Sequence, residues 1–171
     1  VGWPNGLKIH KDGRFFITDY KNGIMQLDPA TGTVTPVLTH RKSESFRGVN
    51  DLVFGNDGTM YFTDQGQTGM HDPTGRVYRY NLETGLLDML VSNAPSPNGL
   101  VLNPEQNTLY VAVTRGNGVW RVPLFPDGGT SKVSIFVSLA GGVCGADGMA
   151  VDSEGRLFVC DAGNGCAWVF T

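Results

Sequence analysis

Short segments of apolar and polar residues recur along the chain at nearly constant intervals. Four of them align, at residues 4–7, 49–52, 97–100 and 146–149. Their polar second positions are separated by 45, 48 and 49 residues and are occupied by Asn5, Asn50, Asn98 and Asp147. Each position is followed by an apolar stretch that predicts a β-strand. A period of this length is typical of solenoids, propellers and other repeat proteins.

Each repeat continues with the same series of turns and strands. A polar turn follows the first strand, with Asp-Gly or Glu-Gly at 12–13, 57–58 and 154–155 and a longer turn at 104–107. Asp-Gly between two apolar runs is a strong hairpin signal. Aromatic and β-branched residues then predict second strands at 14–18, 60–63, 109–113 and 157–160. Third strands are predicted at 24–27, 76–80, 119–122 and 167–170, and fourth strands at 33–38, 86–91 and 132–137.

This series of strands predicts an all-β fold. Four antiparallel strands in about 45 residues are typical of one blade of a β-propeller. We therefore predict a single propeller segment over residues 1–171, with repeats at about 1–46, 47–94, 95–143 and 144–171. The last repeat ends after its third strand. The chain is then either a small four-bladed ring or a segment of a larger ring, and we expect the segment.

Composition agrees with a turn-rich β-protein and argues against several classes of partner. Glycine accounts for 24 of the 171 residues, and 40% hydrophobic with 17% charged residues allows a core to form. The formal net charge of −3 and the lack of a basic stripe argue against nucleic acid as a partner. No apolar run approaches the ~18 residues of a membrane-spanning helix, so no membrane segment is predicted.

The start of the chain and its cysteines bear on cellular location. The chain begins with Val1 and lacks a basic and apolar leader, so we expect a targeting segment to be absent or removed and the natural N-terminus to be missing. A cytoplasmic location is favoured, and the oligomeric state is left open. Three cysteines without a C-x-x-C pair argue against a disulfide framework or a zinc site. Cys160 and Cys166 could still pair across neighbouring strands.

The recurring polar positions predict a site on the propeller axis. The first strand of every blade lines the central channel, so we expect Asn5, Asn50, Asn98 and Asp147 to converge there. One carboxylate and several amide oxygens suit Ca²⁺ better than zinc or copper. The alternative is that Asn or Asp before Gly only forms a tight turn. Repetition in register favours the axial site, with Asn5 either structural or facing substrate.

Other polar residues are predicted to be structural. Asp19, Asp64 and Asp161 end second strands and are expected in turns or between blades. The three histidines show no metal or catalytic spacing and are expected to be structural or on the surface. The segment 65–73 is longer than a hairpin requires. It either covers the channel mouth or forms an ordinary wide turn.

Several of these segments resemble a known family. The chain is similar to the regucalcin/gluconolactonase family (SMP-30/LRE-like) at 48–54 (GVNDLVF), 96–100 (SPNGL) and 145–152 (GADGMAVD), and at 61–64 (YFTD) and 109–112 (LYVA). The motifs occur in the right order and cover essentially the whole chain. The resemblance implies a six-bladed propeller with one divalent metal in its channel, usually Ca²⁺, with Zn²⁺ or Mg²⁺ as alternatives. Family members are mostly lactonases, and some relatives hydrolyse organophosphates.

The resemblance also implies roles for particular residues. Asn98 and Asp147 would ligate the metal directly, and Asn50 would ligate it or contact the substrate. Arg47 is the nearest equivalent of an arginine that often contacts substrate in family members, and Asn5 is a further candidate for substrate contact. The family has another ligand, a Glu on an early blade, which this chain lacks because its glutamates lie in predicted loops or turns. A chain without the first blade of the ring would lack this residue.

The implied reaction is hydrolysis of a lactone, with a sugar lactone such as a gluconolactone favoured. The metal would polarise the carbonyl, and a water would attack it. Asp147 would take the proton of this water, or serve only as a ligand because metal ligation depresses the pKa of a carboxylate. An organophosphate-type phosphotriester hydrolase on the same metal and a non-catalytic binding module are the alternatives. An open propeller exposes two blade faces, so we expect this chain by itself to have little or no activity.

Overall fold

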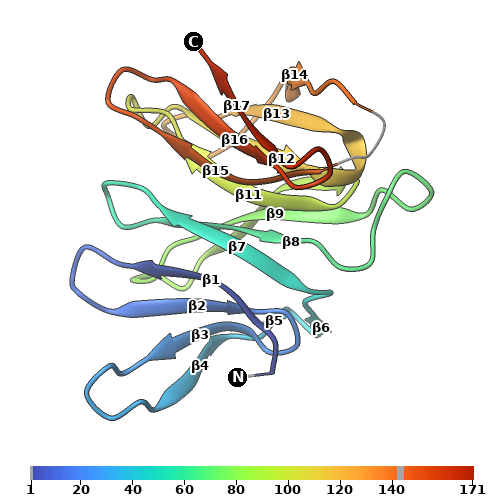
Figure 1. The fold of residues 1–171 in the computed structure, drawn as a ribbon. Coiled ribbons are helices and arrows are strands. Elements are labelled where there is room, and N and C mark those ends of the chain that lie inside the picture. Colours follow the sequence, from blue (N-terminus) through green and yellow to red (C-terminus); the bar gives the residue numbers. More distant parts are fainter. Residues whose placement is uncertain (1, 142–144) are drawn as a thin grey trace.

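Four β-sheets of three or four strands make up most of the chain in the computed structural model, which describes residues 2–141 and 145–171 (Figure 1). The first sheet contains β1 (Pro4–Ile9), β2 (Phe15–Asp19), β3 (Gly23–Leu27) and β4 (Val34–Leu38). The second contains β7 (Val49–Phe54), β8 (Met60–Asp64), β9 (Gly75–Tyr80) and β10 (Leu87–Ala94). The third contains β11 (Pro97–Leu102), β12 (Thr108–Val113), β13 (Gly118–Pro123) and β14 (Ser134–Ser138). The fourth contains β15 (Ala146–Val151), β16 (Leu157–Asp161) and β17 (Cys166–Phe170).

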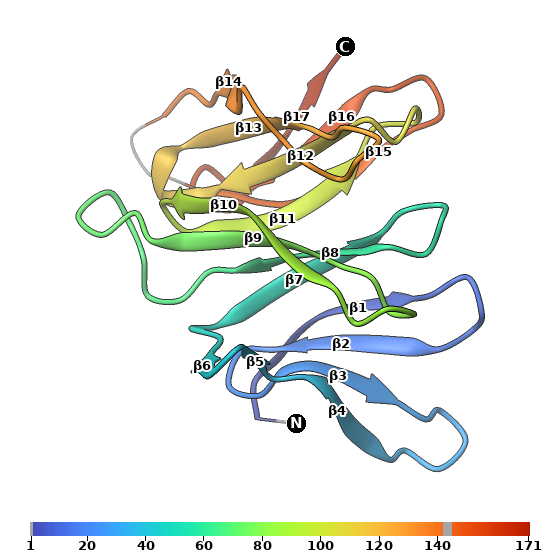
Figure 2. The same cartoon turned by 180° about the vertical axis from the view of Figure 1, so that it is seen from behind.

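The sheets are antiparallel meanders that lie side by side (Figures 1 and 2). The first strand of each sheet lies against the first strand of the next, with β1 beside β7, β7 beside β11 and β11 beside β15. Helical structure in the described part of the chain is limited to the single turn η1 (Thr114–Gly116). Radially arranged four-stranded meanders are blades of a β-propeller. The predicted all-β propeller with about four blades is confirmed, and the six-bladed ring stays a prediction.

One residue with left-handed backbone closes each turn between the first and second strands. Gly13, Gly58 and Gly155 have φ values of 90°, 93° and 82°. Glycine adopts this conformation without the steric penalty that a Cβ imposes. In the third sheet the position belongs to Gln106, with a φ of 59°, because the turn there is one residue longer. The predicted hairpins are therefore confirmed.

A separate apolar cluster fills each interface between neighbouring sheets. The first interface includes Phe16, Ile24, Leu52, Phe62 and Tyr78. The second includes Tyr61, Val77, Leu100, Leu109 and Val111. The third includes Ala112, Val119, Ala146, Leu157 and Val159. Since burying one such side chain stabilises a fold by roughly 1.5–3 kcal/mol, these interfaces hold the blades together.

Burial along a strand depends on how many faces of its sheet are covered. Every residue of β8 is buried, because the second sheet packs against a neighbour on both faces. In β16 buried and exposed residues alternate, and Phe158 is 36% exposed on the open face of the fourth sheet. Leu7 and Ile9 of β1 are 49% and 57% exposed on the open face of the first sheet. The two outer faces of the stack therefore present apolar side chains.

A small hairpin lies between the fourth strand of the first blade and the first strand of the second blade, where the sequence pattern predicts no strand. It pairs β5 (His40–Arg41) with β6 (Glu44–Ser45). The two strands are too short to show an alternating pattern, which is why the sequence does not predict them.

The suggested pairing of Cys160 with Cys166 is wrong. The register of β16 and β17 places Cys160 opposite Ala167 and Cys166 opposite Asp161. Opposite residues share one face of a sheet, and successive residues alternate between faces. The two cysteines therefore lie on opposite faces, and both are free and exposed.

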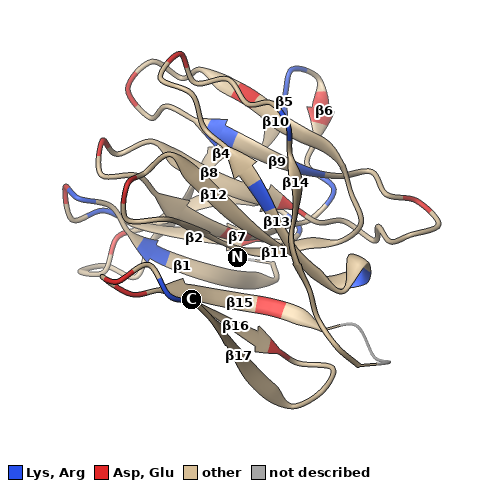
Figure 3. Cartoon of the chain, turned by 90° about the horizontal axis from the view of Figure 1, so that it is seen from above, with Lys and Arg blue, Asp and Glu red and all other residues tan. Residues whose placement is uncertain are grey.

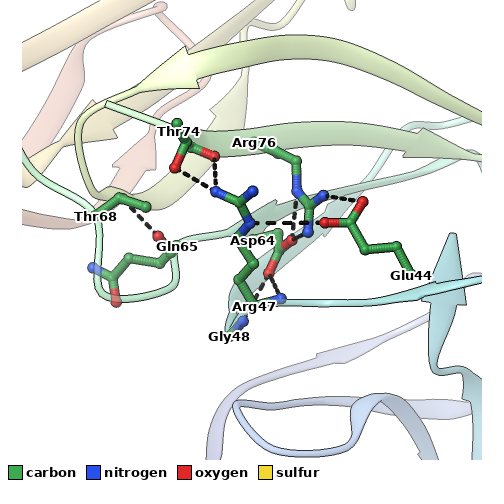
Figure 4. A network of polar contacts seen from close by, with 8 residues as sticks. All are labelled: Glu44, Arg47, Gly48, Asp64, Gln65, Thr68, Thr74 and Arg76. Carbon is green, nitrogen blue, oxygen red and sulfur yellow. Dashed lines mark hydrogen bonds and ion pairs between the residues drawn. The ribbon is translucent and has the colours of Figure 1, made fainter. Parts of the chain in front are cut away.

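Asp64 connects the start of the second blade to its interior (Figure 4). Its carboxylate accepts hydrogen bonds from the backbone N–H groups of Arg47 and Gly48, both at 2.8 Å. It also accepts two from the guanidinium of Arg76, at 2.6 and 2.9 Å. Arg76 pairs in addition with Glu44 at 2.9 Å, which anchors the β5–β6 hairpin. Asp64 is fully buried, so this network satisfies polar groups that would otherwise be costly.

Asp19 and Asp161 occupy the equivalent position in the first and fourth blades and are also buried. Asp19 accepts a hydrogen bond from the N–H of Gly2 at 2.5 Å. Asp161 accepts one from the side chain of Asn164 at 2.8 Å and one from the indole N–H of Trp168 at 3.0 Å. Among the described residues, the hydrogen bonds of all three aspartates thus lie within their own blades, at turns and strand entries.

Replacing Asp64 by Asn should reduce the free energy of unfolding by about 3 kcal/mol, because it removes the principal partner of a buried arginine. The matched control is Asp88→Asn, which breaks the partly exposed pair with Arg79 and should cost at most about 1 kcal/mol. Urea unfolding of both variants checks this expectation. Equal losses would contradict it.

Stability should fall as the pH drops below about 4. Burial by itself would raise the pKa of Asp19, but hydrogen bonds from the backbone N–H groups of Gly2, Trp3 and Lys21 lower it below the ordinary value. The unfolded chain therefore takes up the proton first, and the contribution of Asp19 is lost as pH falls through its folded pKa. Asp19→Asn should lower the urea midpoint more at pH 7 than at pH 3. An exposed control, Glu83→Gln, should show no such difference, and a constant deficit for Asp19→Asn would contradict the assignment.

Candidate active site at the channel mouth

The first strands β1, β7, β11 and β15 all begin at the same end of the stack, which we call the channel mouth (right side of Figure 1). A threonine hydroxyl of one blade donates a hydrogen bond to a backbone carbonyl at the start of the next first strand. The three bonds join Thr18 to Asn50 (2.5 Å), Thr63 to Asn98 (2.7 Å) and Thr114 to Ala146 (2.7 Å). The blades are therefore held in register at the level of the recurring polar residues.

Two glycines allow the first strands to approach one another at the mouth. A Cβ on Gly99 would lie 2.4 Å from the carbonyl oxygen of Asp147, and a Cβ on Gly6 would lie 2.5 Å from Oδ1 of Asp51. At Gly99 the close atom is backbone, so glycine is required for the packing of β11 on β15; at Gly6 it is the end of a side chain, which would have to move to admit a Cβ. Asn5-Gly6 and Asn98-Gly99 lie within strands β1 and β11, so the alternative that Asn before Gly only forms a tight turn is wrong at these two positions.

The side chains of Asn98 and Asp147 have oxygen atoms that are available as metal ligands. Both are partly buried, and neither side chain has a hydrogen-bond or ion-pair partner within residues 2–141 and 145–171. Asn50 is 6% exposed, and its amide N–H donates to Oε1 of Gln65 at 3.0 Å, which leaves its own oxygen available. Carboxylate and amide oxygens from neighbouring strands fit a hard cation such as Ca²⁺. Asn5 lies exposed at the start of β1, at the edge of this group.

Asp51 is a second carboxylate at the mouth that the sequence reasoning did not identify. Burial raises its pKa, the nearby Asp147 raises it further, and Lys8 of β1 opposes both effects. Its Oδ1 accepts a hydrogen bond from the N–H of Leu52 at 2.8 Å. The signal was present in the repeat, because the other three polar positions are followed by Gly and only Asn50 is followed by Asp.

Arg47 lies at the rim of the second blade (Figure 4). Its guanidinium donates to the carbonyl of Thr74 at 3.2 Å and lies 3.9 Å from the carboxylate of Glu44. The predicted substrate contact of Arg47 is not tested by this arrangement and stays a prediction. Glu44 itself is on β6, engaged with Arg76, and is not part of the group on the first strands.

The segment 65–73 is hydrogen-bonded to the mouth and is not an ordinary wide turn. Nε2 of Gln65 donates to the hydroxyl of Ser96 at 2.9 Å, and the N–H of Ser96 donates to the hydroxyl of Thr68 at 3.0 Å. Gly69 and Asp72 then form an isolated β-bridge that closes the tip. The base of this loop thus contacts Asn50 through Gln65, and it contacts Ser96, which lies two residues before Asn98 in the sequence.

Charges are spread over the loops and a few strand positions, including an acidic position on β15 (Figure 3). In the part of the chain that the structure describes, no three His, Cys, Asp or Glu side chains gather closely enough to hold a metal by themselves. A cation at the mouth would therefore depend on amide oxygens as well as on carboxylates. Within the same residues, no helix is long and apolar enough to cross a membrane.

The sequence is similar to curated lactonases. It is 30% identical over 170 residues to a gluconolactonase of Zymomonas mobilis, covering 90% of this chain and 48% of that protein. It is 30% identical over 178 residues to lactonase drp35 of Staphylococcus aureus strain MRSA252, covering 98% of this chain and 53% of that protein. The chain thus spans about half the length of the curated relatives it matches.

The fold and the family agree with this similarity. A gluconolactonase of Xanthomonas campestris superposes with a TM-score of 0.82 at 24% identity, over 98% of this chain and 58% of that one. A calcium-binding protein, regucalcin, of Agrobacterium tumefaciens superposes with a TM-score of 0.80 at 24% identity, over 98% of this chain and 56% of that one. The family model described as "SMP-30/Gluconolactonase/LRE-like region" matches residues 2–171. The chain therefore belongs to the SMP-30/gluconolactonase/LRE-like family.

Proposed function

We propose that the protein hydrolyses a lactone at the channel mouth, with a sugar lactone such as a gluconolactone as substrate. The proposal rests on one observation: Asn98 and Asp147, on adjacent first strands, are partly buried and their side chains have no hydrogen-bond or ion-pair partner among residues 2–141 and 145–171. The curated relatives named gluconolactonase and lactonase support the same reaction class.

Asn98, Asp147 and Asn50 would hold a divalent cation, with Ca²⁺ preferred and Zn²⁺ or Mg²⁺ as alternatives. When bound, such a cation polarises the lactone carbonyl and stabilises the negative charge that develops on its oxygen. The relative described as a calcium-binding protein supports Ca²⁺. Asn50 also lies where it would orient the substrate, because its N–H is fixed by Gln65 at 3.0 Å.

A carboxylate at the mouth would take the proton of the attacking water. The water oxygen bonds to the carbonyl carbon, the ring C–O bond breaks, and the proton passes to the ring oxygen to give a hydroxy acid. Asp147 is our first candidate for this base. Asp51 is the second, because burial raises its pKa towards a more basic range. If Asp147 acts only as a ligand, Asp51 remains available as the base.

Substrate contacts would come from the rim of the mouth. Arg47 and Asn5 lie on the second and first blades at its edge, and we propose them as substrate-binding residues together with Asn50. Arg47 would have to exchange its bond to Thr74 for one to the substrate.

Addition of Ca²⁺ to metal-stripped protein should raise its melting temperature, because a ligand that binds only the folded state stabilises it, by about 2.7 kcal/mol at a hundred times its Kd. Asp147→Ala should abolish the rise. Asp152→Ala, at the opposite end of β15's hairpin, is the matched control and should retain it. An undiminished rise in Asp147→Ala would place the cation elsewhere.

The protein that carries these residues should hydrolyse D-glucono-1,5-lactone, and Asp147→Ala and Asn98→Ala should each lower kcat/KM by about 100-fold or more. A pH-stat assay of acid release measures this, with paraoxon as a paired phosphotriester substrate. Faster turnover of paraoxon would instead favour the phosphotriester hydrolase. Turnover of neither compound would favour a non-catalytic binding module.

A further inference from the structure

A hollow lies between two loops whose bases are hydrogen-bonded to the first strands of the candidate active site. It has a volume of about 410 Å³ and is lined by Thr68, Gly69, Met70, His71 and Arg115. Its walls are the loop after β8 and the turn η1 after β12, both at the channel mouth (Figure 1).

Both segments that line this hollow are hydrogen-bonded to the backbone next to the proposed site residues. Thr114, which directly precedes Arg115, donates to the carbonyl of Ala146, the residue before Asp147, at 2.7 Å. Thr68 accepts from the N–H of Ser96, two residues before Asn98, at 3.0 Å. The walls of the hollow are therefore attached to the backbone that carries the proposed site residues.

The charge in the hollow is positive and uncompensated. Five of the eight arginines pair with an Asp or Glu, whereas Arg115 has no ion pair or hydrogen bond in the described part of the chain. His71 adds a second nitrogen donor. Asp72, the nearest acidic residue in the loop, is not among the lining residues, and its backbone is held by Gly69. Met70, 72% exposed, supplies an apolar surface beside the guanidinium.

We propose that this hollow binds an anionic group of the substrate, a carboxylate or a phosphate, carried at the end of the lactone opposite its carbonyl. The inference rests on the proposed lactonase function and names the substrate class more narrowly. A guanidinium presents paired donors that match the oxygens of either anion. If the lactone carbonyl lies at Asn98 and Asp147, an arginine in a neighbouring subsite would favour anionic over neutral lactones.

The test compares lactones that differ only at this end. D-glucono-1,4-lactone is neutral, D-glucaro-1,4-lactone carries a carboxylate in place of its terminal hydroxymethyl group, and 6-phospho-D-glucono-1,4-lactone carries a phosphate on that group. The protein that carries these residues should have a lower KM for at least one anionic lactone than for the neutral one. Arg115→Ala should raise the KM for the anionic lactones about 10- to 100-fold, as expected for loss of a charged hydrogen bond. Its effect on the KM for the neutral lactone should be far smaller.

Two further variants complete the design. Arg121→Ala, on β13 of the same blade and also without an ion pair among the described residues, is the matched control and should leave all three KM values unchanged. Met70→Glu, at the exposed tip, should raise the KM for the anionic lactones by charge repulsion without removing any bond. This variant tests the site even if Arg115→Ala misfolds.

Equal losses on neutral and anionic lactones, or no loss, would overturn the proposal. If the wild-type protein hydrolyses none of the lactones, the proposed function fails, and calorimetric titration with D-glucarate and inorganic phosphate decides the hollow separately. Binding of either that Arg115→Ala weakens tenfold or more supports the anion site. Absent binding, or binding that Arg115→Ala leaves unchanged, contradicts it.

Discussion

Burial of sheet faces against one another is the constraint on which this structure depends. A four-stranded blade cannot cover its own apolar faces, so each interface has a core of its own. Hydrogen bonds such as that from Thr63 to the carbonyl of Asn98 then fix one blade against the next. Because these bonds end on the first strands, the packing that stabilises the stack also positions the polar residues at the channel mouth.

The site combines a rigid framework with less regular walls. Buried carboxylates such as Asp64 satisfy backbone N–H groups where the chain enters a blade, at a place where unpaired polar groups would be expensive. The loop after β8 and the turn η1 rest on this framework through Thr68 and Thr114. In the proposed function, the first strands would supply the chemistry at the mouth and the loops would select among substrates.

Much of the fold and part of the site could be predicted because they depend on repetition. Asn98 and Asp147 stand out through a spacing that recurs in every blade, and Asp-Gly turns mark the hairpins. The repeat does not predict Asp51, because the other three repeats have Gly at the equivalent position. The sequence does not predict a role for Arg115, because no sequence pattern distinguishes a loop arginine that lines a hollow from one that is only solvated.

By itself, the sequence determined the all-β class and the order of strands, because alternation, turn residues and a long period are local or periodic properties. The family followed from the resemblance of motifs such as those at 48–54 and 145–152. Only the tertiary structure decided which side chains meet. The separation of Cys160 from Cys166 depends on strand register, the raised pKa of Asp51 on burial beside Asp147, and the hollow at Arg115 on loops from two blades. These are contacts between residues distant in sequence, and they arise only when the blades pack.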